Sequence, residues 1–162
     1  MKKFTKLLMF GLVLFGTTIN AKNISKAECL KDTEQFIYAG GECINYFAEE
    51  GDTEGALNII IHGAWKDGTN TLARYTPFAS DVAMNTDITT VAVALPSYSK
   101  SSSNNFEGLL HNSKKPKGST NLEYVKFLAS LIEELKNKHE AKKVNVIAHS
   151  AGAILTATIT GY

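Results

Sequence analysis

The chain has 162 residues, of which 17 are basic and 16 acidic, and 44% are hydrophobic. This length suits one domain with a hydrophobic core, and the sequence contains no internal repeat or interdomain linker. A formal net charge of +1 leaves no basic excess of the kind that nucleic-acid binding requires, so no nucleic-acid partner is expected.

Residues 1–21 have the composition of a secretory signal peptide. Three lysines precede an apolar run over residues 7–15, and small residues then lead to Ala21, after which we expect cleavage. The run is too short to span a bilayer comfortably, so no stable membrane span is expected after cleavage, and an uncleaved amino-terminal anchor is the alternative. The predicted location is therefore secreted or periplasmic, and residues 22–162 form the mature domain.

The chain has two cysteines, Cys29 and Cys43. In an oxidising compartment they can form a disulfide, and closing a loop of about 15 residues contributes roughly 3 kcal/mol in a chain-entropy estimate. Cys43 opens a strand-like run over residues 43–47, after a predicted turn at residues 39–42. The cysteines and histidines do not have the spacing of a zinc site, and we predict no metal or other cofactor.

Three apolar runs rich in β-branched residues predict buried strands at residues 57–61, 89–95 and 143–148. Helical patterns separate these runs, and the apolar residues 151–159 predict one more helix after the last strand. The alternation of strand and helix predicts an α/β fold with parallel strands.

Two helices and a loop are predicted between these strands. Thr76 and Pro77 supply the N-cap and the first residue of one helix. Residues 120–123 fit a capping box before an amphipathic helix that ends near His139. Residues 97–119 are rich in serine, asparagine, lysine and glycine, which predicts a long polar loop over the carboxyl ends of the strands, either shaping a substrate mouth or disordered.

Ser150 stands where the last predicted strand meets the last predicted helix. Its oxygen would lie at the mouth of that helix, whose free N–H groups favour developing negative charge. Ala148 and Gly152, two residues before and two after, are small, as a tight turn requires. The pattern resembles the nucleophile elbow of the α/β-hydrolase family, G-x-S-x-G, with Ala148 in place of the first glycine. A serine that caps a core helix is the alternative interpretation.

The strand at residues 57–61 ends in the sequence His62-Gly63-Ala64-Trp65, which resembles the third strand and the His-Gly oxyanion loop of the same family. The resemblance implies that the N–H groups of Ala64 and Ala151 bind the oxyanion. Each such donor is worth about 3 to 4 kcal/mol in measured cases. We interpret His62 as a neutral histidine that bonds loop backbone, because the family's catalytic base lies elsewhere.

The strand at residues 89–95 leads into Pro96-Ser97-Tyr98-Ser99-Lys100-Ser101. This resembles the family's fourth strand and its Pro-Gly-Tyr-x-x-Ser turn, with Ser97 in the glycine position. The resemblance also implies that the strand at residues 57–61 lies directly between the other two and parallel to both. The segment around Cys43 resembles the amino-terminal hairpin of some exported α/β hydrolases.

Taken together, the resemblance implies a three-layer αβα sandwich with a mainly parallel sheet, with strands one to five present and strands six to eight absent. In this family the acid and the histidine of the triad follow the serine in the chain. Residues 151–162 contain neither, and all histidines precede Ser150: His62, His111, His139 and His149. His149 adjoins the serine, where neighbouring side chains point apart, and His111 is the one alternative base.

Three interpretations remain open. The favoured one is a truncated exported serine hydrolase, whose complete form cleaves a small ester or amide through an acyl-enzyme at Ser150. The second is a non-catalytic exported module that keeps the fold core for binding. The third is an enzyme completed by a separate chain. We expect the 162-residue chain to be poorly soluble, because the strand at residues 143–148 becomes a sheet edge. We also expect it not to react with a fluorophosphonate, because Ser150 lacks a base that takes its proton.

Overall fold

A computed structural model describes residues 23–109 and 121–160. The predicted signal peptide, His111 and the part of the predicted polar loop beyond residue 109 lie outside these ranges. Within them, no helix combines the length and the apolar composition needed to cross a membrane.

Five strands form one mixed sheet in the order β1-β2-β4-β3-β5. Their bounds are Phe36–Ala39 for β1, Glu42–Glu49 for β2, Ala56–Ile61 for β3, Thr90–Val93 for β4 and Lys143–Ala148 for β5. β3 lies between β4 and β5 and is parallel to both, which confirms the predicted strand order. β1 and β2 pair antiparallel, as do β2 and β4, so the sheet is mixed rather than mainly parallel.

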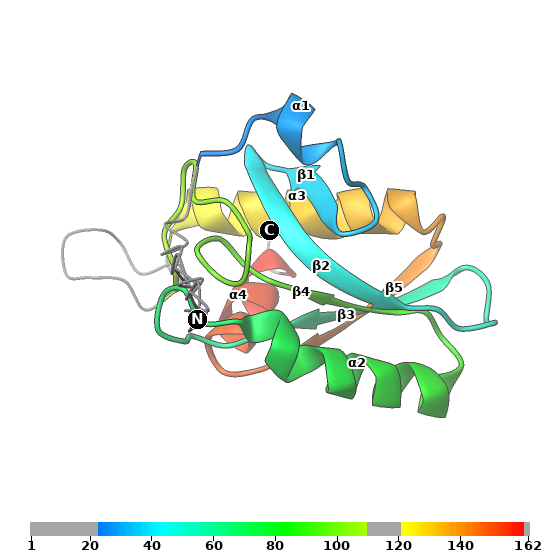
Figure 1. Cartoon of the computed structure of the whole chain (residues 1–162). Helices are drawn as coiled ribbons and strands as arrows, with labels where there is room; N and C mark the ends of the chain where they lie inside the picture. The colour runs from blue at the N-terminus through cyan, green and yellow to red at the C-terminus, as the bar shows by residue number, and fades with distance from the viewer. Residues whose placement is uncertain (1–22, 110–120, 161–162) are drawn as a thin grey trace, which may run out of the picture.

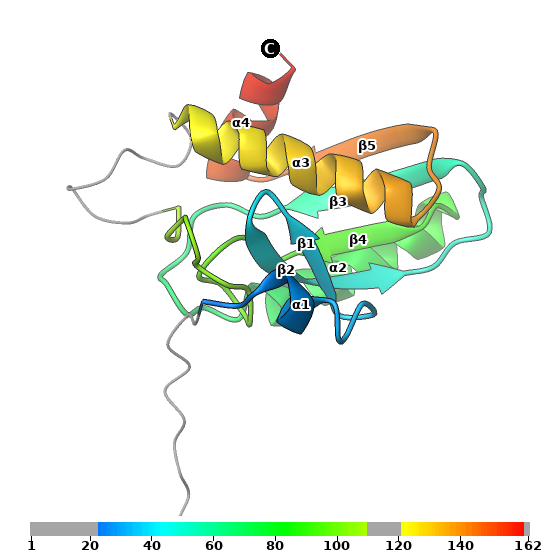
Figure 2. The same ribbon diagram turned by 90° about the horizontal axis from the view of Figure 1, so that it is seen from above.

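Helices cover both faces of the sheet and complete the α/β sandwich (Figures 1 and 2). α2 (Thr71–Thr86) lies on one face, and α3 (Leu122–Lys138) and α4 (Ala151–Ile159) lie on the other. The larger core forms under α3 and α4, where Leu128, Leu131 and Leu155 are fully buried. A smaller core under α2 contains Ile60 and Ala92.

α2 begins earlier than the sequence predicts. The Asn70 side chain accepts a hydrogen bond from the Ala73 N–H at 3.2 Å and caps the helix, so Thr76 is an interior residue. Pro77 lies inside the helix and removes the bond to the carbonyl of Ala73. Ala73 and Pro77 are both exposed, so water can satisfy that carbonyl and the helix continues.

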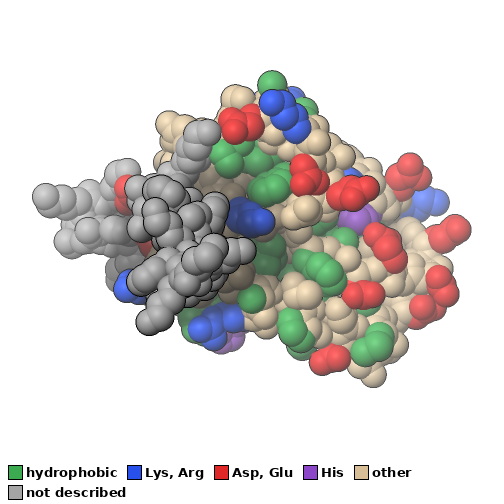
Figure 3. Space-filling view, viewed as in Figure 1, with side chains coloured by type: hydrophobic (Ala, Val, Ile, Leu, Met, Phe, Trp, Pro, Cys, Tyr) green, Lys and Arg blue, Asp and Glu red, His purple; other side chains and the backbone are tan. Residues whose placement is uncertain are grey.

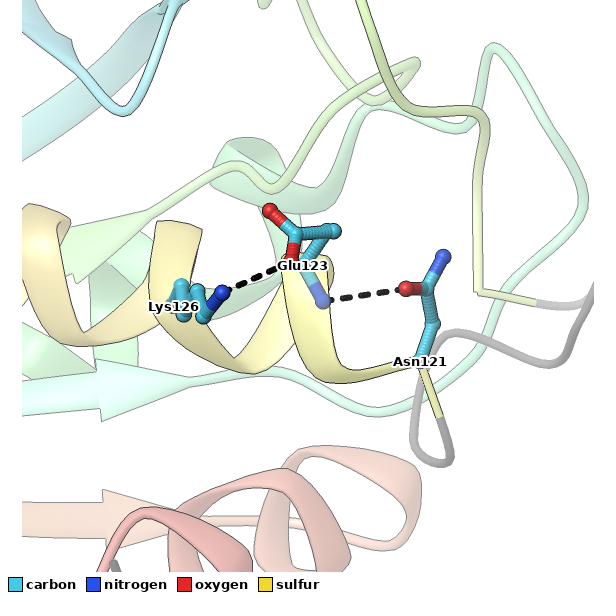
Figure 4. Close-up of polar contacts among 3 residues, drawn as sticks. All are labelled: Asn121, Glu123 and Lys126. Atoms are coloured by element: carbon cyan, nitrogen blue, oxygen red, sulfur yellow. Dashed lines mark hydrogen bonds and ion pairs between the residues drawn. The ribbon is translucent and has the colours of Figure 1, made fainter.

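α3 ends as predicted at its C-cap, His139, but its start differs by one residue. The side chain of Asn121 caps it by accepting the Glu123 N–H at 3.0 Å (Figure 4). Glu123 pairs instead with Lys126, at 2.8 Å across one turn of the exposed face. Thr120, the predicted cap, lies outside the described residues. The charged residues of α3 form a solvated face, as the sequence predicts.

The predicted disulfide joins Cys29, at the end of the short helix α1 (Lys26–Cys29), to Cys43 on β2. Their Cα atoms are 5.6 Å apart, within the usual range for such a bond. The bond ties the segment before β1 to the sheet.

The polar stretch after β4 is more ordered than a solvated loop. Ser101 and Ser102 are buried, and their hydroxyls accept the N–H groups of Asn45 and Cys43 at 2.8 and 2.9 Å. Glu42 is also fully buried, and its carboxylate accepts the Asn104 N–H at 2.8 Å. The described part of this stretch therefore adds hydrogen bonds to β2, because its serines replace the partners that another strand would supply.

Asparagines set the register of the parallel strands. Asn58 on β3 lies opposite Asn145 on β5 and Thr90 on β4. Its side-chain amide donates to the Thr90 hydroxyl at 3.1 Å, and the Asn145 amide donates to the Asn58 carbonyl oxygen at 3.0 Å. A shift of either strand would leave these polar groups unpaired, so the network fixes where β3 and β5 end.

β5 is the edge strand of the described sheet, and this corrects the expectation of a buried strand. Its residues from Val144 to Ala148 are half-buried rather than buried, because only β3 pairs with it. α4 follows it and has an exposed apolar residue, Ile154, at 57% exposure. Neither the strand nor the helix is covered by another described element on its outer side, as the predicted sheet edge requires.

Candidate active site

The turn between β5 and α4 holds Ser150 in a strained backbone conformation. Its φ of 53° and ψ of −122° lie outside the regions that residues with a Cβ adopt freely, at a typical cost of about 1–3 kcal/mol. The Ser150 side chain makes no capping hydrogen bond to α4. Ser150 is the N-cap of α4 by position, as the alternative interpretation expects, but without a side-chain bond this capping does not account for the strain.

Two glycines let the neighbouring backbone approach this turn. A Cβ atom on Gly152 would lie 2.5 Å from the His62 carbonyl oxygen and 2.7 Å from that of Ile61. A Cβ atom on Gly63 would lie 2.9 Å from the Ser150 Cβ. The loop after β3 and the turn after β5 are thus in direct contact, and any larger residue at either glycine would separate them.

Two N–H groups at this contact have no partner among the described residues. They belong to Ala64, after the His62-Gly63 pair, and to Ala151, the first residue of α4. The first turn of α4 contains no acidic residue, so the positive end of its dipole is not neutralised there. Both features suit the binding of a developing anion near Ser150.

His62 is fully buried and bonded at both ring nitrogens. Nε2 accepts the Leu95 N–H at 3.0 Å, so the proton belongs on Nδ1, which donates to the Gly63 carbonyl at 2.6 Å. Burial lowers the pKa of His62 from 6.5 to about 4, which keeps the ring neutral. This backbone-bonding role is the one predicted for His62, and it leaves no ring nitrogen free to act as a base.

Tyr98 holds the same loop from its other side. Its buried hydroxyl donates to the Trp65 carbonyl at 2.7 Å and accepts the Leu109 N–H at 3.2 Å. Its ring meets the His62 ring edge to face, with centroids 4.7 Å apart. Ser97, one residue earlier, has a φ of 69°, which is the left-handed conformation that glycine takes most easily. The serine therefore adopts the backbone shape that the family's glycine position requires.

The other described histidines, His139 and His149, form no hydrogen bond to the Ser150 hydroxyl. His149 meets Tyr75 of α2, with 3.2 Å between its Nδ1 and the tyrosine hydroxyl. His139 lies at the amino end of the sheet, where it lines a cavity of about 710 Å³ with Glu50 and Thr89. His111 lies outside the described residues. Among the residues that the structure describes, none forms a hydrogen bond to the Ser150 hydroxyl.

The family follows from a match over most of this architecture. Residues 47–160 match the family described as "Alpha/beta hydrolase of unknown function (DUF900)". The chain belongs to this α/β-hydrolase family. No curated protein sequence matches the chain.

Solved structures of α/β hydrolases have the same fold. The chain is similar to the esterase Est1E of Butyrivibrio proteoclasticus with bound ferulic acid, at 15% identity, a TM-score of 0.55, and coverage of 77% of this chain and 46% of that one. It is also similar to the epoxide hydrolase VrEH1 of Vigna radiata, at 17% identity and a TM-score of 0.53, over 78% and 33% of the two chains. A third similar structure is the esterase Pf2001 of Pyrococcus furiosus, at 15% identity and a TM-score of 0.52, with coverage of 74% of this chain and 42% of that one.

At 15–17% identity, these structural similarities show the fold of the chain and nothing about its substrate. The chain spans less than half the length of each of the three proteins. Sequence reasoning missed Tyr75 as a partner of His149, because no local pattern joins a helix residue to a turn 74 positions away.

Proposed function

We propose that the α/β hydrolase to which these residues belong cleaves a small ester or amide in its complete form, with Ser150 as nucleophile and the N–H groups of Ala64 and Ala151 as oxyanion donors. The observation that carries the proposal is the strained Ser150 turn in contact with Gly63, beside two N–H groups without described partners. Strain of this kind is retained in proteins where function needs it.

The reaction would be an acyl transfer in two steps. The Ser150 oxygen attacks the carbonyl carbon, a base takes the hydroxyl proton, and the negative oxygen faces the two N–H groups. The leaving alcohol or amine departs with a proton, and water then hydrolyses the acyl-enzyme. The residues described here supply the nucleophile, the donors and the rigid loop that holds one of them.

Export is part of the proposal. The predicted signal peptide and the disulfide between Cys29 and Cys43 both favour a secreted or periplasmic protein, because such bonds persist in oxidising compartments. Mass spectrometry of the protein recovered from its natural compartment should find residue 22 at its amino terminus and the two cysteines bonded. Two free thiols would contradict this part.

The decisive experiment supplies the proton acceptor from solution. A serine hydroxyl reacts slowly without a base, and no described residue bonds to that of Ser150. The purified chain is incubated with a fluorophosphonate at increasing concentrations of imidazole, and labelled peptides are identified. We expect no measurable labelling without imidazole and imidazole-dependent labelling at Ser150.

Two controls make this result specific. Ser150→Ala should abolish the labelling, and urea-unfolded protein should not be labelled, because the turn and the oxyanion donors are lost. Labelling that persists in Ser150→Ala, or that is spread over several serines, would contradict the proposal. Folded protein without labelling at any imidazole concentration would favour the non-catalytic binding module.

A further inference from the structure

A cation and an aromatic ring meet at the edge of the candidate site. The Arg74 guanidinium carbon lies 4.5 Å from the centroid of the Trp65 ring. Trp65 follows the proposed oxyanion donor Ala64 in the chain, and Arg74 precedes Tyr75, whose hydroxyl contacts His149. The pair therefore borders the two segments that meet at the proposed nucleophile.

The residue types at this position are unusual for the chain. Arg74 is its only arginine and Trp65 its only tryptophan, and every other basic residue is a lysine. A guanidinium presents a planar fork of N–H donors that binds a carboxylate or phosphate with two parallel hydrogen bonds, which an ammonium group does not do. The contact with the indole face restricts the position of the guanidinium, and its exposure leaves N–H donors available for such a ligand.

No protein anion neutralises Arg74 in the described part of the chain. It makes no ion pair or hydrogen bond there, and it is exposed. It lies in the first turn of α2, which contains no acidic residue, so the positive end of the helix dipole adds to its charge. Asp67 and Glu107 in the neighbouring loops each have a partner already. The charge of the Arg74 guanidinium is therefore unpaired within the described residues.

Acidic side chains gather at the opposite end of the sheet. Figure 3 shows them over its amino ends, at the right of the view. Glu50, Glu54 and Glu140 are exposed, and all three line the cavity that contains His139 at this end. An anionic ligand is repelled there and attracted toward the end that contains Arg74.

We propose that Arg74, stacked on Trp65, recognises a carboxylate or phosphate group of the ligand. This inference rests on the proposed function. If Ser150 is the nucleophile, its substrate is an ester or amide that also carries a free anionic group, such as the monoester of a dicarboxylic acid. The pair determines specificity and takes no part in bond cleavage.

Trp65 allows a direct test, since its fluorescence reports this place alone. The purified chain is titrated with monomethyl glutarate, propyl phosphate and neutral dimethyl glutarate. We expect the anions to change the Trp65 emission and saturate, with the neutral diester at least about tenfold weaker, because hydrogen bonds to charged groups exceed 1.4 kcal/mol. The stronger of the two anions identifies the group that the fork prefers.

Variants separate the guanidinium fork from net charge. Arg74→Gln should weaken the anion about tenfold, and Arg74→Lys should weaken it less, because it keeps the charge without the fork. Lys126→Gln removes one exposed cation on α3 and should leave the affinity unchanged. Equal affinity for anion and neutral diester, or unchanged binding in folded Arg74→Gln, would overturn the proposal.

The binding titration does not depend on the nucleophile. Ser150→Ala should bind the anion as the unmodified chain does. If Ser150 is not labelled at any imidazole concentration but the anion still binds, the proposed function is contradicted and the proposed anion site is supported. If Ser150 is labelled but no anion binds, the serine hydrolase stands and its substrate does not require a free anionic group.

Discussion

Two turns lie side by side at the carboxyl end of the sheet, and they are held in opposite ways. After β3, buried side chains fix the backbone: His62 bonds to the backbone of Leu95, and Tyr98 bonds to that of Trp65. After β5, Ser150 has a strained backbone, and its hydroxyl bonds to no described residue.

This difference matches what acyl transfer asks of each turn. An oxyanion donor must already point at the place where charge develops, because reorganisation during the reaction would weaken its effect. A nucleophilic hydroxyl must be free to lose its proton, so a permanent hydrogen bond would be a disadvantage. The comparison predicts that changes where the two turns touch affect stability most, and that changes at Ser150 trade stability against reactivity.

The largest effect is expected where the two turns touch. Gly152→Ala should lower the free energy of unfolding by about 3 kcal/mol, at the upper end of overpacking effects. The loss comes from a clash with backbone, since the new Cβ would lie 2.5 Å from the His62 carbonyl oxygen. Urea unfolding of both proteins measures the difference.

Gly68→Ala is the matched control for this change. Gly68 has a φ of 77°, and a Cβ added to it would meet no heavy atom within 4 Å. Gly68→Ala should therefore lower the free energy of unfolding by only about 1 kcal/mol, because alanine adopts the left-handed backbone conformation less easily than glycine. A Gly152→Ala protein as stable as Gly68→Ala would show that the two turns are not in contact.

A second effect follows from the lowered pKa of His62. In the unfolded chain its pKa returns to 6.5, so between pH 6.5 and about 4 the unfolded state binds more protons than the folded one. The contribution of neutral His62 to the free energy of unfolding is therefore fully present above the unfolded-state pKa of 6.5. It is lost as the pH falls toward the folded-state pKa of about 4. Between about pH 7.5 and 5 the loss is about 2 kcal/mol.

His62→Gln removes this titration. The free energy of unfolding of this variant should therefore fall by about 2 kcal/mol less than that of the unmodified chain between about pH 7.5 and 5. His139 needs a separate control, because burial also lowers its pKa and its contribution has the same sign. His139→Gln should keep the contribution of His62. Nuclear magnetic resonance tests the point without unfolding, because the His62 ring should titrate near pH 4. A midpoint near 6.5 would contradict the buried, doubly bonded ring.

The sequence predicts the parts of this comparison that depend on local pattern. Apolar runs locate β3 and β5, and the small residues around Ser150 indicate the sharp turn between β5 and α4. The order of the parallel strands followed from family resemblance, and the disulfide followed from Cys29 and Cys43 being the only pair.

The remaining features depend on contacts between residues distant in sequence. Asn70 caps α2 although Thr76 before a proline is the stronger local signal, because the loop before the helix is held by Ser99, whose hydroxyl donates to the Asn70 side chain at 3.1 Å. The role of Ser101 in bonding β2 and the stacking of Arg74 on Trp65 are equally non-local. Pattern and propensity carry no information on such pairs.

The smallest expected effect is the most direct test of strain at the nucleophile. Ser150→Gly should raise the free energy of unfolding by about 1 kcal/mol, since glycine adopts this backbone freely and recovers part of the strain after its own entropy cost. Ser150→Ala keeps the Cβ and loses only a hydroxyl without described partners, so its stability should change by less than about 0.5 kcal/mol. Urea unfolding measures both, and both variants should lose imidazole-dependent labelling. Equal stabilisation by glycine and alanine would assign the cost to the hydroxyl, and destabilisation by glycine would show that the turn at Ser150 is not strained.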